Sequence, residues 1–256
     1  MVSFTTEQLT QRWEDQRALK NLMGKYANCI ILNREQDIFD LFWSREDDIC
    51  LSFNDGAYVG AEAVSGYYKA CWQRNRLVAS LMQARFPEQL GGKSEEEIYG
   101  VGPFKVKPLS SPVIEVAADG RTAKGLWHCQ GAYNDVETCG PVANWTWGYF
   151  AVDFIRTEDG WKLWHMSYTN DVDCICGQSW GKEKQPLPDL PEFAALADFH
   201  YPPYTVEKTL RELYTPARPH TDCPRIPEPY NTFASATAFE RRADNHEQES
   251  QARVHR

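Results

Sequence analysis

The stretch Asn144–Thr169, NWTWGYFAVDFIRTEDGWKLWHMSYT, consists of two strand-like runs on either side of an Asp-Gly pair. Runs rich in aromatic and β-branched residues are typical of β-strands, and Asp-Gly between two such runs predicts a tight hairpin turn. A second pair, Asp119–Gly120, separates the runs Ser111–Ala117 and Thr122–Tyr133 in the same way. The second half of the chain therefore predicts a meander of long antiparallel strands.

Three segments that precede these strands have helical spacing. Thr6–Asn33 begins with a capping threonine and places Tyr26 on its apolar face. Gln36–Trp43 and Ala61–Phe86 also repeat apolar residues at three- and four-residue steps, and a short strand, Ile49–Phe53, lies between them. Helices first and strands second predict an α+β fold in which a curved antiparallel sheet wraps around N-terminal helices.

Composition excludes several classes of function. The chain has 256 residues, is 42% hydrophobic and 25% charged, and has a formal charge of -9, so it can bury a core and its surface repels phosphate backbones. No apolar run reaches the length of a membrane span, and Met1–Gln11 lacks the pattern of a signal peptide. We expect a cytoplasmic protein with no nucleic-acid or membrane partner.

The cysteines and glycines suggest neither a metal site nor a cofactor site. Eight cysteines are scattered, and the nearest pair, Cys174 and Cys176, lacks the C-x-x-C spacing of a metal or redox motif. The sequence also lacks a glycine-rich phosphate loop after a strand. We therefore expect no metal and no cofactor.

Several short motifs, taken in their order along the chain, resemble the nuclear transport factor 2-like superfamily. The segments that carry the resemblance are Lys25–Ala27, Asp37–Phe42, Gly60–Ala63, Pro112–Ala123 and Asp159–Leu163. This superfamily of conical α+β proteins includes polyketide cyclases, ketosteroid isomerase, scytalone dehydratase and bile acid 7α-dehydratase. The resemblance implies a cone that encloses a cavity, and the residues of that cavity must decide the function.

The resemblance, which ends near residue 176, and the proline-rich and then charged composition that follows together predict a domain layout. We expect a cone-shaped domain over residues 1–176, a proline-rich wrapping extension over 177–238 and a disordered tail over 239–256. Within the extension, Phe193–Asp198 and Val206–Leu213 have helical spacing. The extension could cover the sheet or close the mouth of a cavity, its own or that of a neighbouring subunit.

By the same resemblance, Tyr26 takes the place of a tyrosine whose hydroxyl points into the cone and hydrogen-bonds a developing oxyanion. Related lyases carry an aspartate five residues later, where this chain has Ile31. Their histidine precedes the strand that begins at Pro112, where this chain has Lys107, or Val106 in a shifted register. The usual dyad is absent, which leaves a different base, a lysine-assisted reaction in which Lys107 stabilises a phenolate, or no catalysis.

His165 is the sharpest candidate for a group that moves a proton. Strand alternation over Trp161–Thr169 places it on the same face as Leu163, so we expect the imidazole to face the cavity. Asp171 follows on the same strand and could orient the ring. The same alternation places His128 on the outer face of the sheet.

Aromatic residues are abundant, with nine Trp, twelve Tyr and twelve Phe, and they predict a cavity that binds an aromatic substrate. The expected substrate-binding residues are Phe53, Tyr68, Trp127, Trp147 and Leu163.

These observations predict a cofactor-independent lyase or dehydratase for a hydroxylated aromatic or polycyclic small molecule, with Tyr26, His165, Lys107 and Asp171 as its catalytic residues. Long-tailed members of the superfamily include diarylpropane formaldehyde lyases, to which the chain is similar in layout. This similarity suggests a lignin-derived diaryl substrate that loses water or formaldehyde.

Two alternatives remain. One is a noncatalytic ligand-binding or assembly subunit. The other is an isomerase or cyclase, although Ser52 and Phe53 stand where related isomerases keep a carboxylate base. In each case, a one-layer sheet with apolar outer residues such as Leu126 predicts a homo-oligomer, either a dimer or a trimer.

Overall fold

The computed structural model describes residues 4–181, 185–208, 213–217 and 224–239. The helical elements are α1 (Thr6–Ile31), α2 (Glu35–Phe42), α3 (Ala61–Arg85), α4 (Pro87–Leu90), α5 (Glu95–Ile98) and the 3-10 turns η1 (Pro191–Leu196) and η2 (Ser235–Thr237). The strands are β1 (Cys50–Ser52), β2 (Gly56–Val59), β3 (Phe104–Val106), β4 (Leu109–Val116), β5 (Thr122–Glu137), β6 (Gly140–Thr157), β7 (Gly160–Ile175) and β8 (Val206–Glu207).

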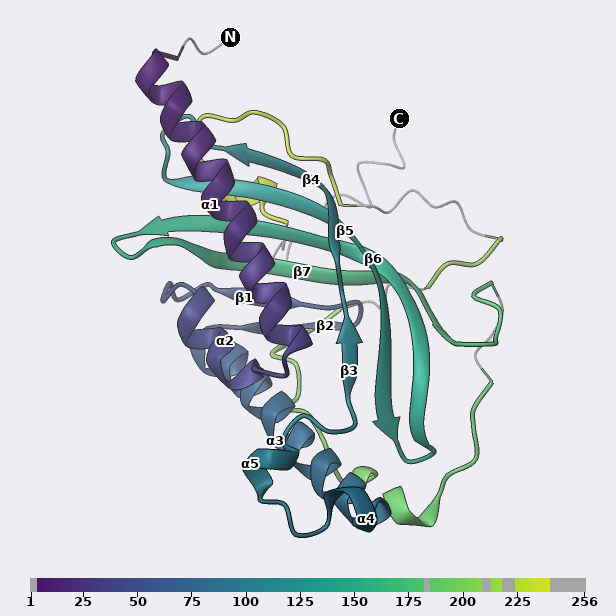
Figure 1. Cartoon of the computed structure of the whole chain (residues 1–256). Helices are drawn as coiled ribbons and strands as arrows, with labels where there is room; N and C mark the ends of the chain where they lie inside the picture. The colour runs from purple at the N-terminus through teal and green to yellow at the C-terminus, as the bar shows by residue number, and fades with distance from the viewer. Residues whose placement is uncertain (1–3, 182–184, 209–212, 218–223, 240–256) are drawn as a thin grey trace.

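All the described strands belong to one curved sheet. The order is β3-β5-β6-β7-β1-β2-β8, and β4 pairs with the first half of β5 while β3 pairs with its second half. Only the β1–β7 pairing is parallel among these strands. Figure 1 shows the long strands β5 and β6 bending strongly, with α1, α2 and α3 on the concave side. The expected α+β architecture, a curved sheet around N-terminal helices, is confirmed.

Helix α1 is fixed to the sheet at both the backbone and the side-chain level. Thr5 and Gln8 form a reciprocal capping box at its start, which satisfies amide groups that no helical turn can reach. Arg12 and Gln16 donate to the carbonyl oxygens of Ala117 and Ile114 at the end of β4. The apolar face of α1, which includes Tyr26, therefore packs inside the curve of the sheet.

The predicted strands and helices match the described elements with small shifts at their ends, and one prediction is wrong. Val206–Leu213 was expected to be helical, but Val206 and Glu207 form β8 and pair with Ala57 and Gly56 of β2. Residues 209–212 lie outside the described part of the chain. The segment forms a strand although its apolar residues have helical spacing. The reason is that the edge of β2 offers backbone hydrogen-bond partners, which a short helix would lack at its ends.

Two β-bulges in β7 change which face its side chains occupy. Asp153 pairs with His165 and the next residue, Phe154, pairs with Leu163, so Trp164 is an extra residue. A second irregularity places Gly148 opposite Asn170 and Trp147 opposite Val172. An extra residue shifts the alternation by one. Leu163 therefore faces the helices, whereas His165 faces outward.

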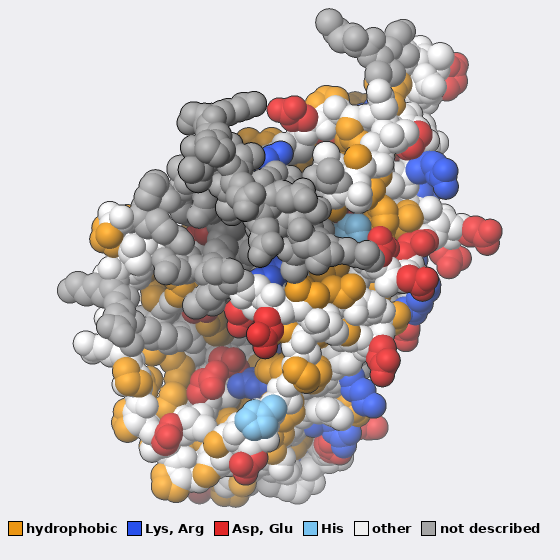
Figure 2. Space-filling model, turned by 180° about the vertical axis from the view of Figure 1, so that it is seen from behind, with side chains coloured by type: hydrophobic (Ala, Val, Ile, Leu, Met, Phe, Trp, Pro, Cys, Tyr) orange, Lys and Arg blue, Asp and Glu red, His pale blue; other side chains and the backbone are white. Residues whose placement is uncertain are grey.

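The outer face of the sheet is partly covered by the described end of the chain. Phe239 packs on Leu126, Tyr149 and Ala151. Phe239 is the first residue of the predicted disordered tail, and it is packed against the sheet. The rest of that tail, residues 240–256, lies outside the described part of the chain. Figure 2 shows this side, where hydrophobic and charged side chains mix at the surface. His128 is exposed on this face, and its ring centroid lies 4.8 Å from that of Tyr149, which agrees with its predicted outward position. The expected homo-oligomer stays a prediction.

Candidate functional site

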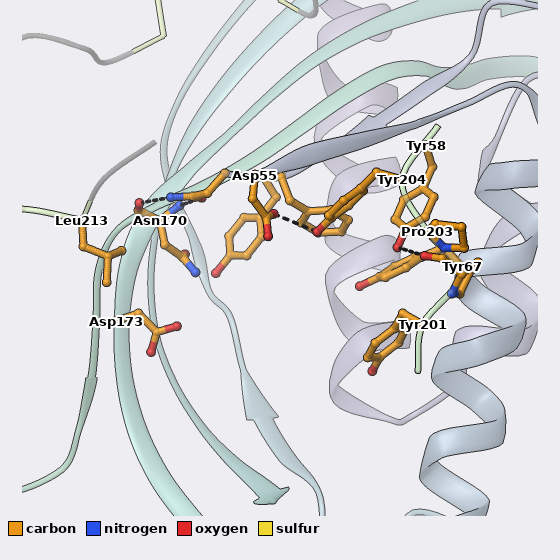
Figure 3. Close-up of a pocket in the computed structure, with 13 residues that line it drawn as sticks. Asp55, Tyr58, Tyr67, Asn170, Asp173, Tyr201, Pro203, Tyr204 and Leu213 are labelled. Carbon is orange, nitrogen blue, oxygen red and sulfur yellow. Dashed lines mark hydrogen bonds between the residues drawn. The ribbon is translucent and has the colours of Figure 1, made fainter. Parts of the chain in front are cut away.

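A cavity of about 720 Å³ opens between β7, the β1–β2 turn, α3 and the proline-rich extension (Figure 3). We call it the tyrosine cavity. It is lined by Phe53, Asn54, Asp55, Tyr58, Tyr67, Tyr168, Asn170, Asp173, Tyr201, Pro202, Pro203, Tyr204 and Leu213. A volume of this size accommodates a small organic molecule.

One side of the tyrosine cavity is aromatic. Tyr58 lies 5.1 Å from Tyr67 and 4.9 Å from Tyr204, measured between ring centroids. Tyr201 stacks on Tyr67 at 5.7 Å. Burial raises the pKa of Tyr58 to about 12, so this phenol stays neutral near pH 7. The rings provide an apolar wall with neutral hydroxyls at its edges.

The opposite side is polar and is built mainly by the end of β7. In Figure 3, Asn170 and Asp173 lie across the open space from the tyrosines. The Asn54 side-chain amide forms two hydrogen bonds with the Asn170 backbone, both at 2.8 Å. Its Nδ2 donates to the Asn170 carbonyl oxygen, and its Oδ1 accepts from the Asn170 amide. The Tyr133 hydroxyl contacts both carboxylate oxygens of Asp173, at 2.7 and 2.9 Å. This wall therefore presents the Asp173 carboxylate to the cavity, with its orientation fixed by Tyr133.

Tyr168 lies at the base of this polar wall. Its ring stacks on Phe150 with centroids 4.5 Å apart, and its hydroxyl is buried without a hydrogen-bond partner among the described residues. The Lys107 ammonium lies 4.1 Å from the centroid of the Tyr168 ring. Because buried polar groups are normally paired, this hydroxyl, which belongs to a residue that lines the cavity, is a candidate ligand contact.

The charge of Lys107 is maintained by its surroundings. Burial lowers the pKa of the ammonium, but the Tyr168 phenol, the Cys129 thiol and the Asp173 carboxylate raise it, and the net shift is upward. Lys107 is therefore a cation next to Tyr168 at neutral pH. Lys107 does not line the tyrosine cavity itself but lies against Tyr168, which does, and its predicted role in a lysine-assisted reaction stays a prediction.

Tyr26 and Tyr68 form a buried pair in the core and do not line the tyrosine cavity. Their hydroxyls are 3.2 Å apart, and the Trp43 indole donates to the Tyr68 hydroxyl at 3.2 Å. Burial raises the pKa of both phenols. The Tyr26 ring packs edge to face on Phe150, and Phe150 in turn stacks on Tyr168, so Tyr26 helps to hold the Tyr168 ring in place.

The prediction that His165 faces the cavity is wrong. The bulge at Trp164 turns its ring to the outer face, where Nδ1 lies 3.0 Å from the fully buried Asp153 carboxylate. The Lys124 ammonium donates to the same carboxylate at 2.7 Å. We call Lys124, Asp153 and His165 the outer cluster. Asp171 is six residues further along β7, roughly 20 Å away at about 3.3 Å per residue, so it does not orient His165.

The five predicted substrate-binding residues separate into three groups. Phe53 lines the tyrosine cavity and Tyr68 lies behind it. Trp127 and Leu163 are buried in the core against the helices. Trp147 lies on the outer face beside Trp145, with 38% of its surface exposed, so it cannot contact a ligand in the cavity.

Sequence reasoning missed all five tyrosines that line the cavity. Tyr67 is adjacent to the predicted Tyr68 and faces the cavity instead of it. Tyr201 and Tyr204 form a Tyr-Pro-Pro-Tyr segment in the extension, for which the sequence left open whether it covers the sheet or closes the mouth of a cavity. Two tyrosines around a proline pair are the available signal, since proline fixes an extended backbone that can present both rings.

The described residues contain no group of three or more His, Cys, Asp or Glu side chains arranged to hold a metal ion. No described helix combines the length and apolar character needed to cross a bilayer.

A sequence model of the SnoaL-like domain matches residues 11–167, more than half of the chain. The protein belongs to the SnoaL-like family. The predicted resemblance to the nuclear transport factor 2-like superfamily is thereby confirmed. No curated protein matches this SnoaL-like chain in sequence.

Solved structures resemble the SnoaL-like chain distantly. A protein from Novosphingobium aromaticivorans with the provisional name of an aromatic ring hydroxylase is 19% identical, with 61% of this chain and 89% of that chain covered and a TM-score of 0.41. A provisionally named scytalone dehydratase from the same species is 12% identical, with 72% and 97% covered and a TM-score of 0.46. A hexachlorocyclohexane dehydrochlorinase from Novosphingobium barchaimii is 14% identical, with 68% and 97% covered and a TM-score of 0.45.

The SnoaL-like match ends at residue 167, just before the polar wall of the cavity begins. Tyr168, Asn170 and Asp173 and the extension residues Tyr201 and Tyr204 all lie beyond it. The match therefore covers most of the cone but not the second half of β7, and residues beyond the match supply much of the cavity wall.

Proposed function

We propose that the protein is a cofactor-independent lyase that eliminates water, or formaldehyde, from a hydroxylated aromatic molecule bound in the tyrosine cavity. One observation carries the proposal. A single cavity combines an aromatic wall, a carboxylate (Asp173) and a buried hydroxyl without a partner (Tyr168). An elimination needs a base, an acid for the leaving group and a surface that binds the ring, and these residues offer all three.

The reaction can be written for a phenol that carries a hydroxyl on its para benzylic carbon. The Asp173 carboxylate accepts the phenolic proton, and the electron pair passes through the ring as the benzylic C–O bond breaks. The leaving oxygen takes a proton from the Tyr168 hydroxyl and departs as water, which leaves a quinone methide. Proton transfer from Asp173 to Tyr168, directly or through water, restores both groups.

Neighbouring groups support these two roles. The Tyr133 hydroxyl donates to Asp173 and fixes the direction of the carboxylate. The Lys107 ammonium beside Tyr168 is placed to stabilise negative charge that develops at this end of the cavity. Lys107 thus keeps the role of anion stabiliser that the sequence suggested, in place of the absent histidine. Tyr26 acts in this proposal as a supporting residue behind Phe150 and Tyr168.

The test is turnover of para-hydroxybenzylic alcohols with one or two rings, followed by mass without added cofactor. Wild type is compared with Asp173→Asn and Tyr168→Phe. Asp198→Asn, at an exposed position, and Tyr149→Phe, on the outer face, serve as matched controls. Circular dichroism and thermal unfolding check that each variant is folded.

We expect loss of 18 mass units from the alcohol in wild type and both controls. Asp173→Asn and Tyr168→Phe should each lower kcat/KM about 100-fold or more, the usual contribution of a general acid or base. Tight binding with no turnover in wild type would contradict the lyase proposal and leave the ligand-binding subunit. Turnover that both cavity variants retain would contradict the assigned roles.

A further inference from the structure

The two ends of the tyrosine cavity differ in chemistry. Asp173, Asn170 and Tyr168 form the polar end, where the proposed elimination takes place. Tyr58, Tyr67 and Tyr201 gather at the other end, and Figure 3 shows them across the open space from Asp173. Tyr58 is buried among these rings, whereas Tyr201 is exposed, so a molecule with one ring at the polar end would leave the Tyr201 surface in contact with water. Apolar surface of this kind favours a second apolar group.

Tyr201 is the most open of these rings. It stacks on Tyr67 at 5.7 Å with an interplanar angle of 29°, and Phe199 meets it edge-on at 5.5 Å. Despite these contacts, 42% of its surface is exposed, and it lines the cavity. The ring is therefore held in orientation by two neighbours and retains free surface for a third.

The segment that carries Tyr201 is fixed to the cone by several hydrogen bonds. The Tyr58 hydroxyl donates to the Pro202 carbonyl at 3.0 Å, and the Tyr204 hydroxyl donates to Asp55 at 2.8 Å. Directly after it, β8 pairs with β2. Because the backbone is already tied down, ordering this wall costs little when a ligand binds.

We propose that the aromatic end of the tyrosine cavity is a subsite for the second ring of a two-ring substrate, with Tyr201 as its main contact. The proposal rests on the proposed function only for the position of the first ring, next to Asp173. It makes the extension a part of the binding site of its own chain. It also places the choice between one-ring and two-ring substrates beyond the residues that match the SnoaL-like domain.

Calorimetric titration of the full chain tests the subsite without any need for turnover. The probes are 4-methylphenol, which has one ring, and 4-benzylphenol, which has two. Neither carries the benzylic hydroxyl that leaves in the proposed elimination, so the heat reports binding alone. Tyr201→Leu removes the ring but keeps an apolar side chain, and Tyr201→Phe keeps the ring. His200→Ala is the matched control, since His200 is an exposed neighbour in the same segment that does not line the cavity.

Wild type should bind the two-ring probe at least ten times more tightly than the one-ring probe. Tyr201→Leu should remove most of this preference with little effect on the one-ring probe, whereas Tyr201→Phe and His200→Ala should keep it. Equal affinity of wild type for the two probes, or a preference that Tyr201→Leu retains, would overturn the subsite. A preference that depends on Tyr201, in a protein that converts none of the para-hydroxybenzylic alcohols, would support the subsite and contradict only the lyase.

Discussion

The inner and outer faces of β6 and β7 both carry titratable side chains, but they use them differently. On the outer face, Asp153 accepts hydrogen bonds from Lys124 and from the Phe239 amide and contacts His165. On the inner face, the Tyr168 hydroxyl has no partner within the described chain, and Asp173 borders a cavity. A cluster whose members satisfy one another stabilises the fold, whereas an unsatisfied group next to open space can bind a ligand.

The outer cluster also holds the end of the described chain in place. The Lys124 ammonium donates to the Thr237 carbonyl at 2.8 Å and lies 4.8 Å from the Phe233 ring centroid and 5.0 Å from that of Phe239. A buried cation with a carboxylate partner and aromatic neighbours is a stable arrangement with little freedom to react. We therefore assign stability to the outer face and chemistry to the inner face.

The largest expected effect is on the outer face. Asp153→Ala leaves the Lys124 ammonium buried without its carboxylate, which should lower the free energy of unfolding by about 3–5 kcal/mol. Urea unfolding measures this loss. The control Asp159→Ala changes an exposed turn residue and should stay within about 0.5 kcal/mol of wild type. If the two substitutions have equal effects, the outer cluster does not stabilise the fold.

The next effect is on pH dependence and concerns Cys71 of α3, one of the helices inside the curve of the sheet (Figure 1). Burial raises the pKa of the Cys71 thiol from 9.0 to about 11. The unfolded chain loses this proton near pH 9 and the folded chain near pH 11, so the contribution is complete below pH 9 and is lost as pH rises to 11. Each unit of pKa difference corresponds to about 1.4 kcal/mol.

Urea unfolding between pH 8 and pH 11 checks this expectation. The free energy of unfolding should fall over that range, and the fall should be smaller in Cys71→Ala. The control Cys176→Ala changes an exposed thiol and should leave the slope unchanged. A slope in Cys71→Ala that equals the wild-type slope would contradict the effect of burial on this thiol.

The smallest expected effect distinguishes a structural role of Tyr26 from a catalytic one. Tyr26→Phe removes the hydroxyl contact with Tyr68 and should lower the free energy of unfolding by about 1 kcal/mol, while kcat/KM stays within about threefold of wild type. Urea unfolding and steady-state kinetics measure the two quantities. A 100-fold loss of activity with unchanged stability would restore Tyr26 to the catalytic role that the family resemblance implies.

The elements with local signals could be predicted from the sequence. The capped, periodic α1 and the Asp-Gly hairpin between β6 and β7 follow from contacts within a few residues, and the outward position of His128 follows from alternation alone. The inward position of His165 was wrong because alternation assumes a strand without an extra residue. Nothing in Trp164–His165 marks the bulge, which depends on how β6 pairs with β7.

The aromatic wall could not be predicted for a different reason. Tyr201 and Tyr204 reach the cavity through contacts with Tyr67 and Asp55, more than 130 residues earlier in the chain. Local spacing has no information about such contacts. Lys107 and Phe53 could be placed near the cavity because the family resemblance supplies the layout of the cone, which spacing alone does not.

The account depends on which face of β7 performs the chemistry, and a paired kinetic measurement tests this directly. Asp173→Asn and His165→Gln are compared by kcat/KM on the para-hydroxybenzylic alcohol that wild type converts fastest, after both variants are shown to be folded. We expect Asp173→Asn to lose about 100-fold or more and His165→Gln to stay within about threefold of wild type. A loss of activity in His165→Gln, with Asp173→Asn unaffected, would place the reaction on the outer face and contradict the account.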